Sequence, residues 1–125
     1  MTAQIYRIKI SLEHVEPPVW RRIEVPGDVT LARLHAIIQR VMGWEDYHMW
    51  SFQVGKTEYQ TGSGEMFDFG DGPRARSPAG TTLEQATQGR RISFRYWYDF
   101  GDDWFHAIKV ERVADPEPGA IYPRC

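Results

Sequence analysis

The sequence contains a single cysteine, Cys125, at its last position. One thiol excludes a disulfide within the chain and any zinc site built from several of its own cysteines. No apolar stretch approaches the length of a transmembrane helix, and residues 1–7 lack the hydrophobic run of a signal peptide. We therefore expect a cytoplasmic protein with no membrane contact and no disulfide-linked partner.

An excess of charge of one sign is also missing. The chain has 15 Lys and Arg against 17 Asp and Glu, which gives a formal net charge of −2. Such a chain has no general attraction for a phosphate backbone or an anionic membrane. The glycine patterns of nucleotide-binding loops and the Gly-x-Ser-x-Gly motif of serine hydrolases are absent too. These absences disfavour nonspecific nucleic-acid binding and the enzyme classes that depend on those motifs.

Aromatic residues, in contrast, are abundant. They make up 14% of the 125 residues and include five tryptophans. Large aromatic side chains dominate either a core or an interface, so some of them are expected to face a partner. The length suits one domain. We predict a single α+β domain over residues 1–113 and a proline-rich C-terminal tail over residues 114–125.

Alternation of apolar and polar residues predicts a mostly antiparallel sheet of about six strands packed on one main helix. The expected strands cover residues 5–12, 19–25, 48–54, 57–60, 91–98 and 104–113. The order along the chain is two strands, the helix and then four strands. A loop rich in Gly, Pro and Arg, residues 61–80, precedes a short helical turn at 81–86 and the last hairpin.

The main helix is predicted by apolar residues at helical spacing: Leu31, Leu34, Ile37, Ile38 and Val41. Thr30 is suited to the N-cap, and Gly43 to the C-terminal stop. The polar side of this helix carries Arg33, Gln39 and Arg40. The simplest interpretation of this mildly basic stripe is a face turned to solvent.

The last hairpin holds the densest polar cluster, because Asp99, Asp102 and Asp103 lie close together and His106 follows them. Carboxylates beside a histidine suit a divalent metal site or a general acid and base. Asp and Gly are also the default residues of hairpin loops, where they satisfy the turn's own backbone. We favour the structural interpretation. His48 and His106 share strand parity with apolar residues, so both are predicted on the core side of the sheet.

Two sets of candidate residues follow from this region. The binding set, on and beside the last hairpin, comprises Trp97, Tyr98, Asp99, Asp102, Asp103, Trp104 and His106. The metal set, for the alternative function only, comprises Asp99, Asp102, Asp103, His106 and His48, and His35 on the helix is a further candidate. No catalytic residue is assigned.

A local case for nucleic acid rests on arginines mixed with aromatic residues. The residues are Arg74, Arg76, Arg90, Arg91 and Arg95, with Trp97 and Tyr59 expected to be exposed. Stacking rings beside cations suit single-stranded nucleic acid. Arginines near a sheet edge are, however, more often solvated charges that discourage edge pairing. We give the second interpretation more weight.

Several spaced segments carry a family resemblance. They read YRIKI (6–10), PPVWRR (17–22), TLARLH (30–35), Gly43-Trp44, His48, Phe52 and YDFGDDWFH (98–106). Together they resemble the plasmid pRiA4b ORF-3-like family, also labelled insertion-element passenger or TnpR-family proteins. The resemblance implies a small α+β domain, often encoded on plasmids and mobile elements, without an established activity. The resolvase activity suggested by the TnpR label is not carried over, because a resolvase-like serine motif and a helix-turn-helix segment are missing.

Two functions from different classes follow. The favoured one is a non-enzymatic binding module that presents the last hairpin to a protein or nucleic-acid partner and needs no cofactor. The alternative is a metal-dependent enzyme of the hydrolase or nuclease type, in which a divalent ion held by the Asp and His cluster activates water.

Overall fold

A computed structural model of the chain describes residues 3–44, 49–60, 75–99 and 103–125. The elements are β1 (Ile5–Leu12), β2 (Trp20–Pro26), α1 (Leu31–Met42), β3 (Trp50–Val54), β4 (Thr57–Gln60), β5 (Ala75–Arg76), the 3₁₀ turn η1 (Pro78–Gly80), α2 (Leu83–Thr87), β6 (Ser93–Tyr98) and β7 (Trp104–Ala114).

The strands form one sheet in the order β2-β1-β7-β6-β3-β4-β5. All neighbouring pairs are antiparallel except β4 and β5, which are parallel. The predicted α+β fold and its order of elements are thereby confirmed. The predicted loop 61–80 also contributes β5 and η1, which its composition did not indicate. A strand of two residues is too short to show an alternation of apolar and polar residues, so only its pairing with β4 defines β5.

The main helix begins and ends where its caps were predicted. Thr30 accepts a hydrogen bond from the backbone N–H of Arg33, and Gly43 adopts the left-handed conformation at φ +79°. One expectation for this helix was wrong: Gln39, placed on the solvent side, is 4% exposed. Its amide donates to the Tyr96 hydroxyl, so a polar partner in the sheet draws it inward.

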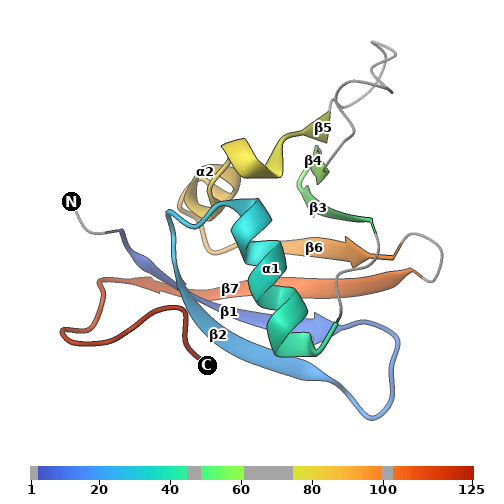
Figure 1. The fold of residues 1–125 in the computed structure, drawn as a ribbon, viewed down its shortest axis with the longest axis horizontal. Helices are drawn as coiled ribbons and strands as arrows, with labels where there is room; N and C mark the ends of the chain where they lie inside the picture. The colour runs from blue at the N-terminus through green and yellow to red at the C-terminus, as the bar shows by residue number, and fades with distance from the viewer. Residues whose placement is uncertain (1–2, 45–48, 61–74, 100–102) are drawn as a thin grey trace.

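The sheet has one covered face and one face without a helix. The covered face, called the inner face below, carries buried side chains from neighbouring strands: Ile8, Ile10, Ile23, Phe52, Tyr96, Ile108 and Val110. Figure 1 shows α1 lying across this face, and Leu83 of α2 belongs to the same core. Within the described residues, no helix lies over the other face, called the outer face.

The C-terminal segment returns to the sheet beyond β7. Glu24 and Arg124 exchange two backbone hydrogen bonds, with N–O distances of 2.7 and 3.0 Å. The Arg124 guanidinium also bonds the Glu24 carboxylate at 2.8 Å and the Glu117 carboxylate at 2.9 Å. Residues near the end of the chain therefore lie along the edge strand β2, where Figure 1 also places the C-terminus.

None of the helices in the described part of the chain has the length and apolar character needed to span a membrane.

Candidate binding site

The residues predicted to form one site are divided between the two faces of the sheet. Trp97 lies on the outer face, where its indole N–H donates to the Asp103 carboxylate at 3.0 Å. Tyr98 and His106 are buried on the inner face, and Trp104 is half-buried beside them. Strict alternation along β6 and β7 separates neighbours in sequence in this way. The hairpin therefore offers two different surfaces.

His106 is held from both ring nitrogens. Its Nε2 lies 3.2 Å from the indole nitrogen of Trp44, and its Nδ1 lies 3.2 Å from the carbonyl oxygen of Tyr96. Because an indole N–H only donates and a carbonyl only accepts, Nδ1 carries the proton and Nε2 accepts. Burial lowers the pKa of His106, which favours this neutral form. Neither nitrogen is available to a metal unless one of these bonds breaks.

His35 belongs to a second buried network. Its ring stacks on Trp50 at 3.9 Å between centroids, and its Nδ1 forms a hydrogen bond of 2.5 Å with the Tyr96 hydroxyl. Gln39 donates to the same hydroxyl at 2.8 Å. Three polar side chains from α1 and β6 thus meet inside the core. These contacts tie the helix to the sheet.

Backbone geometry defines the two described residues at the ends of the last hairpin's strands, Asp99 after β6 and Asp103 before β7. Asp99 and Asp103 have positive φ angles of 64° and 57°, and the Asp103 N–H donates to the Asp99 carbonyl at 2.6 Å. Asp is one of the few residue types that enter this conformation readily. The Asp99 N–H also donates to the carbonyl of Met49. These are bonds of the backbone, so the structural interpretation of the carboxylates stays a prediction.

The described residues contain no group of three His, Cys, Asp or Glu side chains placed to hold a metal ion. Asp103 faces Trp97 on the outer side, whereas His106 is enclosed on the inner side. Two members of the predicted metal set, His48 and Asp102, lie outside the described residues.

The outer face carries an organised pair of aromatic rings. Trp97 and Phe105 are register partners, and their rings stack with centroids 5.2 Å apart and planes 17° apart. The Arg95 guanidinium lies 4.6 Å from the centre of the Phe105 ring. Arg95 itself makes two hydrogen bonds of 3.0 Å to the Glu13 carboxylate. We call Trp97, Phe105 and Arg95 the outer aromatic patch.

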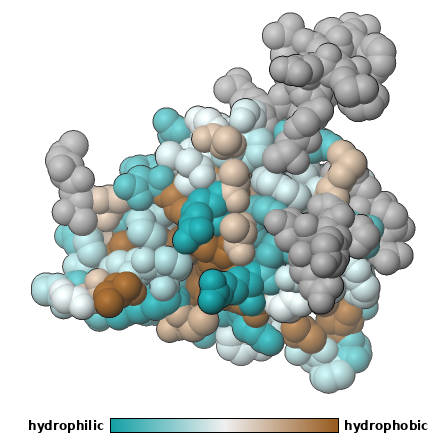
Figure 2. All heavy atoms as spheres, viewed as in Figure 1, coloured by the Kyte–Doolittle hydropathy of each residue, from teal (hydrophilic) through white to brown (hydrophobic). Residues whose placement is uncertain are grey.

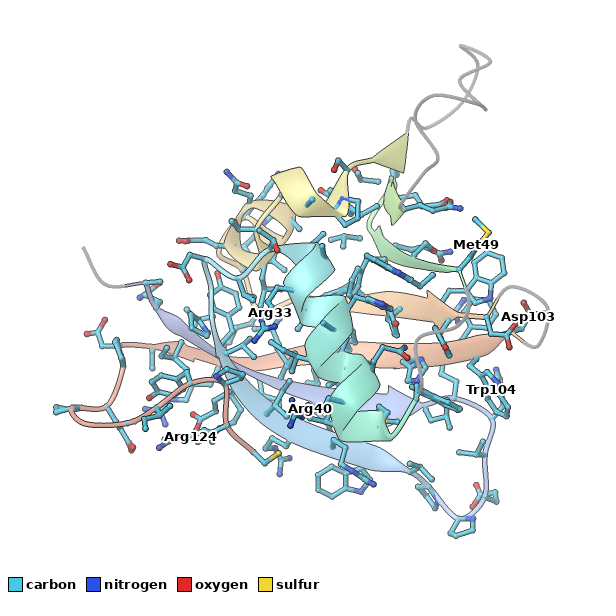
Figure 3. The ribbon with its side chains drawn as sticks, viewed as in Figure 1. Arg33, Arg40, Met49, Asp103, Trp104 and Arg124 are labelled. Atoms are coloured by element: carbon cyan, nitrogen blue, oxygen red, sulfur yellow. The ribbon has the colours of Figure 1, made fainter. Side chains whose placement is uncertain are left out.

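The surroundings of this patch include an exposed apolar side chain. Met49 is 54% exposed, and Figure 3 places it at the same end of the molecule as Asp103 and Trp104. Reasoning from the sequence did not single out Met49 or Phe105. The alternation along the two strands predicts that Trp97 and Phe105 can lie on the same face of the sheet. It does not show that they are neighbours until the pairing register of the strands is known.

The residues proposed for nucleic acid are described only in part, and those that are described differ in burial and in ion pairing. Tyr59, expected to be exposed, is 6% exposed because it faces the core beside Phe52, its register partner. Arg90 and Arg91 are exposed just before β6, whereas Arg95 is paired with Glu13. Arg74 and the side chain of Arg76 lie outside what the structure describes.

The resemblance read from the sequence is supported by a family model, that of the plasmid pRiA4b ORF-3-like protein, which matches residues 4–125. The chain belongs to this family. The fold also resembles that of a solved structure, a protein of unknown function, MM3350, from Methanosarcina mazei Go1. The two structures superpose with a TM-score of 0.84 at 30% identity, over 98% of this chain and 68% of the other.

A second relative is the uncharacterized protein y4hQ of Sinorhizobium fredii (strain NBRC 101917 / NGR234). It is 42% identical over 114 residues, which are 90% of this chain and 56% of y4hQ. The chain thus spans little more than half the length of this relative. The family, as these matches describe it, consists of proteins without an assigned activity.

Proposed function

We propose that this chain is a cytoplasmic, non-enzymatic binding module, associated with plasmids or mobile elements, that recognises a protein through the outer aromatic patch. The observation that carries the proposal is the stacked pair Trp97 and Phe105, half-buried on a sheet face that no described helix covers. Trp and Arg are the residue types that most often dominate binding energy at protein interfaces.

The patch is held rigid before any partner arrives. Asp103 fixes the Trp97 indole by a hydrogen bond, and Arg95 is oriented over Phe105 by two bonds to Glu13. A side chain that is already ordered loses less conformational entropy on binding. This arrangement therefore favours an interface over an ordinary solvated surface.

The charges around the patch favour a protein over nucleic acid. Arg95, the one cation among the described residues that contacts the rings, is matched by Glu13, and Asp103 adds a negative charge beside Trp97. Phosphate backbones are bound by an excess of unpaired cations, which this patch does not supply. An apolar anchor on a protein surface fits the rings without that requirement.

The inner-face polar groups give less support to a catalytic function. His106 uses both ring nitrogens in internal hydrogen bonds, and His35 is enclosed by Trp50 and Tyr96. A general base must reach the proton that it takes from a substrate. Their engagement favours a role in stability.

The test compares two tryptophans on the same face of the sheet. Trp97→Ala and Trp20→Ala make the same change, but Trp20, 43% exposed, lies on the edge strand β2. Tagged wild-type and variant chains are used to capture interacting proteins after nuclease treatment, and the captured proteins are quantified by mass spectrometry. We expect a protein that wild type and Trp20→Ala retain and that Trp97→Ala loses by about tenfold or more.

A thermal melt of each variant separates loss of binding from loss of folding. Asp103→Asn is a second probe, because an amide oxygen still accepts from the indole and should preserve capture. Equal capture by wild type and Trp97→Ala would contradict the proposal. Capture that disappears on nuclease treatment would instead assign the patch to nucleic acid.

A further inference from the structure

A cleft lies on the opposite side of the molecule from the outer aromatic patch, between α1 and the C-terminal segment. Its volume is about 450 Å³, and Arg33, Ile37, Arg40 and Val41 of α1 form one wall. Residues 123–125 form the other wall, and the buried side chain of Ile23 lies between them. The size is in the range of natural ligand sites.

Two of the cations in this cleft form no ion pair within the described part of the chain. The guanidinium groups of Arg33 and Arg40 make no ion pair with any described residue, and both side chains are exposed. Arg124 differs, because Glu24 and Glu117 bind it and hold its pKa above the ordinary value. The excess positive charge therefore comes from the two arginines of α1.

The spacing of these arginines places them on one side of the helix. Seven residues are about two turns, so their Cα atoms are separated by about 10 Å along the axis. Figure 3 shows both side chains on the side of α1 that faces the C-terminal segment. Figure 2, from the same direction, shows hydrophobic side chains between hydrophilic ones at this place. Ile37 and Val41 supply apolar surface beside the two charges.

The opposite wall is anchored to the sheet. The backbone bonds between Glu24 and Arg124, and the ion pairs of the Arg124 guanidinium, fix residues 123–125 along β2. The cleft is thus bounded by a helix and by a segment with its own contacts to a strand. Such a boundary allows side chains of a ligand to be enclosed from two sides.

We propose that this cleft binds an acidic peptide segment of a partner protein, in which two carboxylates about 10 Å apart flank apolar side chains. The carboxylates pair with Arg33 and Arg40, and the apolar side chains lie against Ile37 and Val41. Charge complementarity carries the choice of ligand, because an arginine guanidinium binds a carboxylate with two parallel hydrogen bonds. This inference is independent of the outer aromatic patch.

A designed peptide tests the proposal directly. The probe is a fluorescein-labelled helical peptide with Glu at its positions i and i+7 and Leu at i+3 and i+4, since seven helical residues span about 10 Å. A second probe has Lys in place of both Glu. Binding to the full chain is followed by fluorescence anisotropy at low and high salt. We expect the Glu probe to bind, more weakly at high salt, and the Lys probe not to bind.

The variants replace arginines of α1 by glutamine, which has no charge but a similar helix propensity. Arg33→Gln and Arg40→Gln together should weaken binding of the Glu probe by about tenfold, because each exposed ion pair adds a modest amount. Arg91→Gln is the matched control, since Arg91 is exposed and lies outside the cleft. Trp97→Ala should leave binding of the Glu probe unchanged, which separates this site from the outer aromatic patch.

Several outcomes would overturn the proposal. They are equal binding of both probes, absence of binding by the Glu probe, or equal weakening by Arg91→Gln. Displacement of the Glu probe by single-stranded DNA, lost in the double variant, would assign the arginines to nucleic acid. Concentration-dependent dimerisation that the double variant abolishes would assign the cleft to a second copy of the chain.

Discussion

Both faces of the sheet carry aromatic side chains with polar hydrogen-bonding or charged partners, but the two sets differ in burial and in the role that we infer for them. On the inner face, the polar atoms of His35, Tyr96 and His106 are used in internal hydrogen bonds, and the rings are buried. On the outer face, Asp103 and Arg95 order rings that stay half-buried. An aromatic ring with a polar partner therefore says little about function until its burial is known. On the inner face, buried rings with polar partners hold the helix and the sheet together. On the outer face, such rings are ordered at the surface, where we propose that a partner binds.

The largest effect that would sharpen this comparison comes from replacing one tryptophan on each face. Trp50→Ala removes a buried ring that stacks on His35, and we expect it to lower the free energy of unfolding by about 3 to 5 kcal/mol. Trp97→Ala on the outer face should cost about 1 kcal/mol. Urea unfolding at neutral pH measures both. Similar losses for the two variants would break the distinction between the faces.

A smaller loss of stability is expected when a single buried hydroxyl oxygen is removed. Tyr96→Phe removes the hydroxyl that His35 and Gln39 share, so both buried groups lose a partner. We expect a loss of about 1 to 3 kcal/mol in the free energy of unfolding. Tyr122→Phe is the control, because its hydroxyl only accepts from the Glu117 backbone at the surface. An unchanged denaturation midpoint for Tyr96→Phe would show that this network contributes nothing to stability.

The smallest effect is a pH dependence that belongs to the inner face. Burial lowers the pKa of His106, so the unfolded chain takes up a proton at higher pH than the folded chain. Stability is therefore complete above the ordinary histidine value of about 6.5 and falls as the pH decreases below it. His106→Asn, whose amide can still donate to the Tyr96 carbonyl, should reduce this slope between about pH 6.5 and 5.

The two glutamates with lowered pKa values, Glu24 and Glu111, titrate below that pH range. Hydrogen bonds from Arg124 and Arg22 lower the pKa of Glu24 and Glu111, so their contribution is lost only as the pH falls below the ordinary value of about 4.3. Melting temperatures of wild type and His106→Asn, recorded from about pH 7.5 to 5, test the assignment. Parallel curves would mean that another group carries the pH dependence in this range.

Much of the fold was predictable because its signals are local. Thr30 and Gly43 cap α1 as expected, and the alternation around Ile8 and Ile108 placed both side chains on the buried face. The candidate site was harder. The structure brings Trp97 and Asp103 of the predicted binding set into contact, but Tyr98 and His106 of the same set face the other side of the sheet. Nearness in sequence misleads in a strand, where successive side chains alternate.

By itself the sequence determined the main helix with its caps, the six longer strands and most of the residues suited to a core, because these depend on neighbours within a few positions. Only the tertiary structure decided which sheet face α1 covers, how Phe105 meets Trp97, and that residues 123–125 lie beside Arg33 and Arg40. Those arrangements depend on strand register and on contacts between residues far apart in the chain. Local propensity does not specify them, so the chemistry of both proposed sites became visible only in three dimensions.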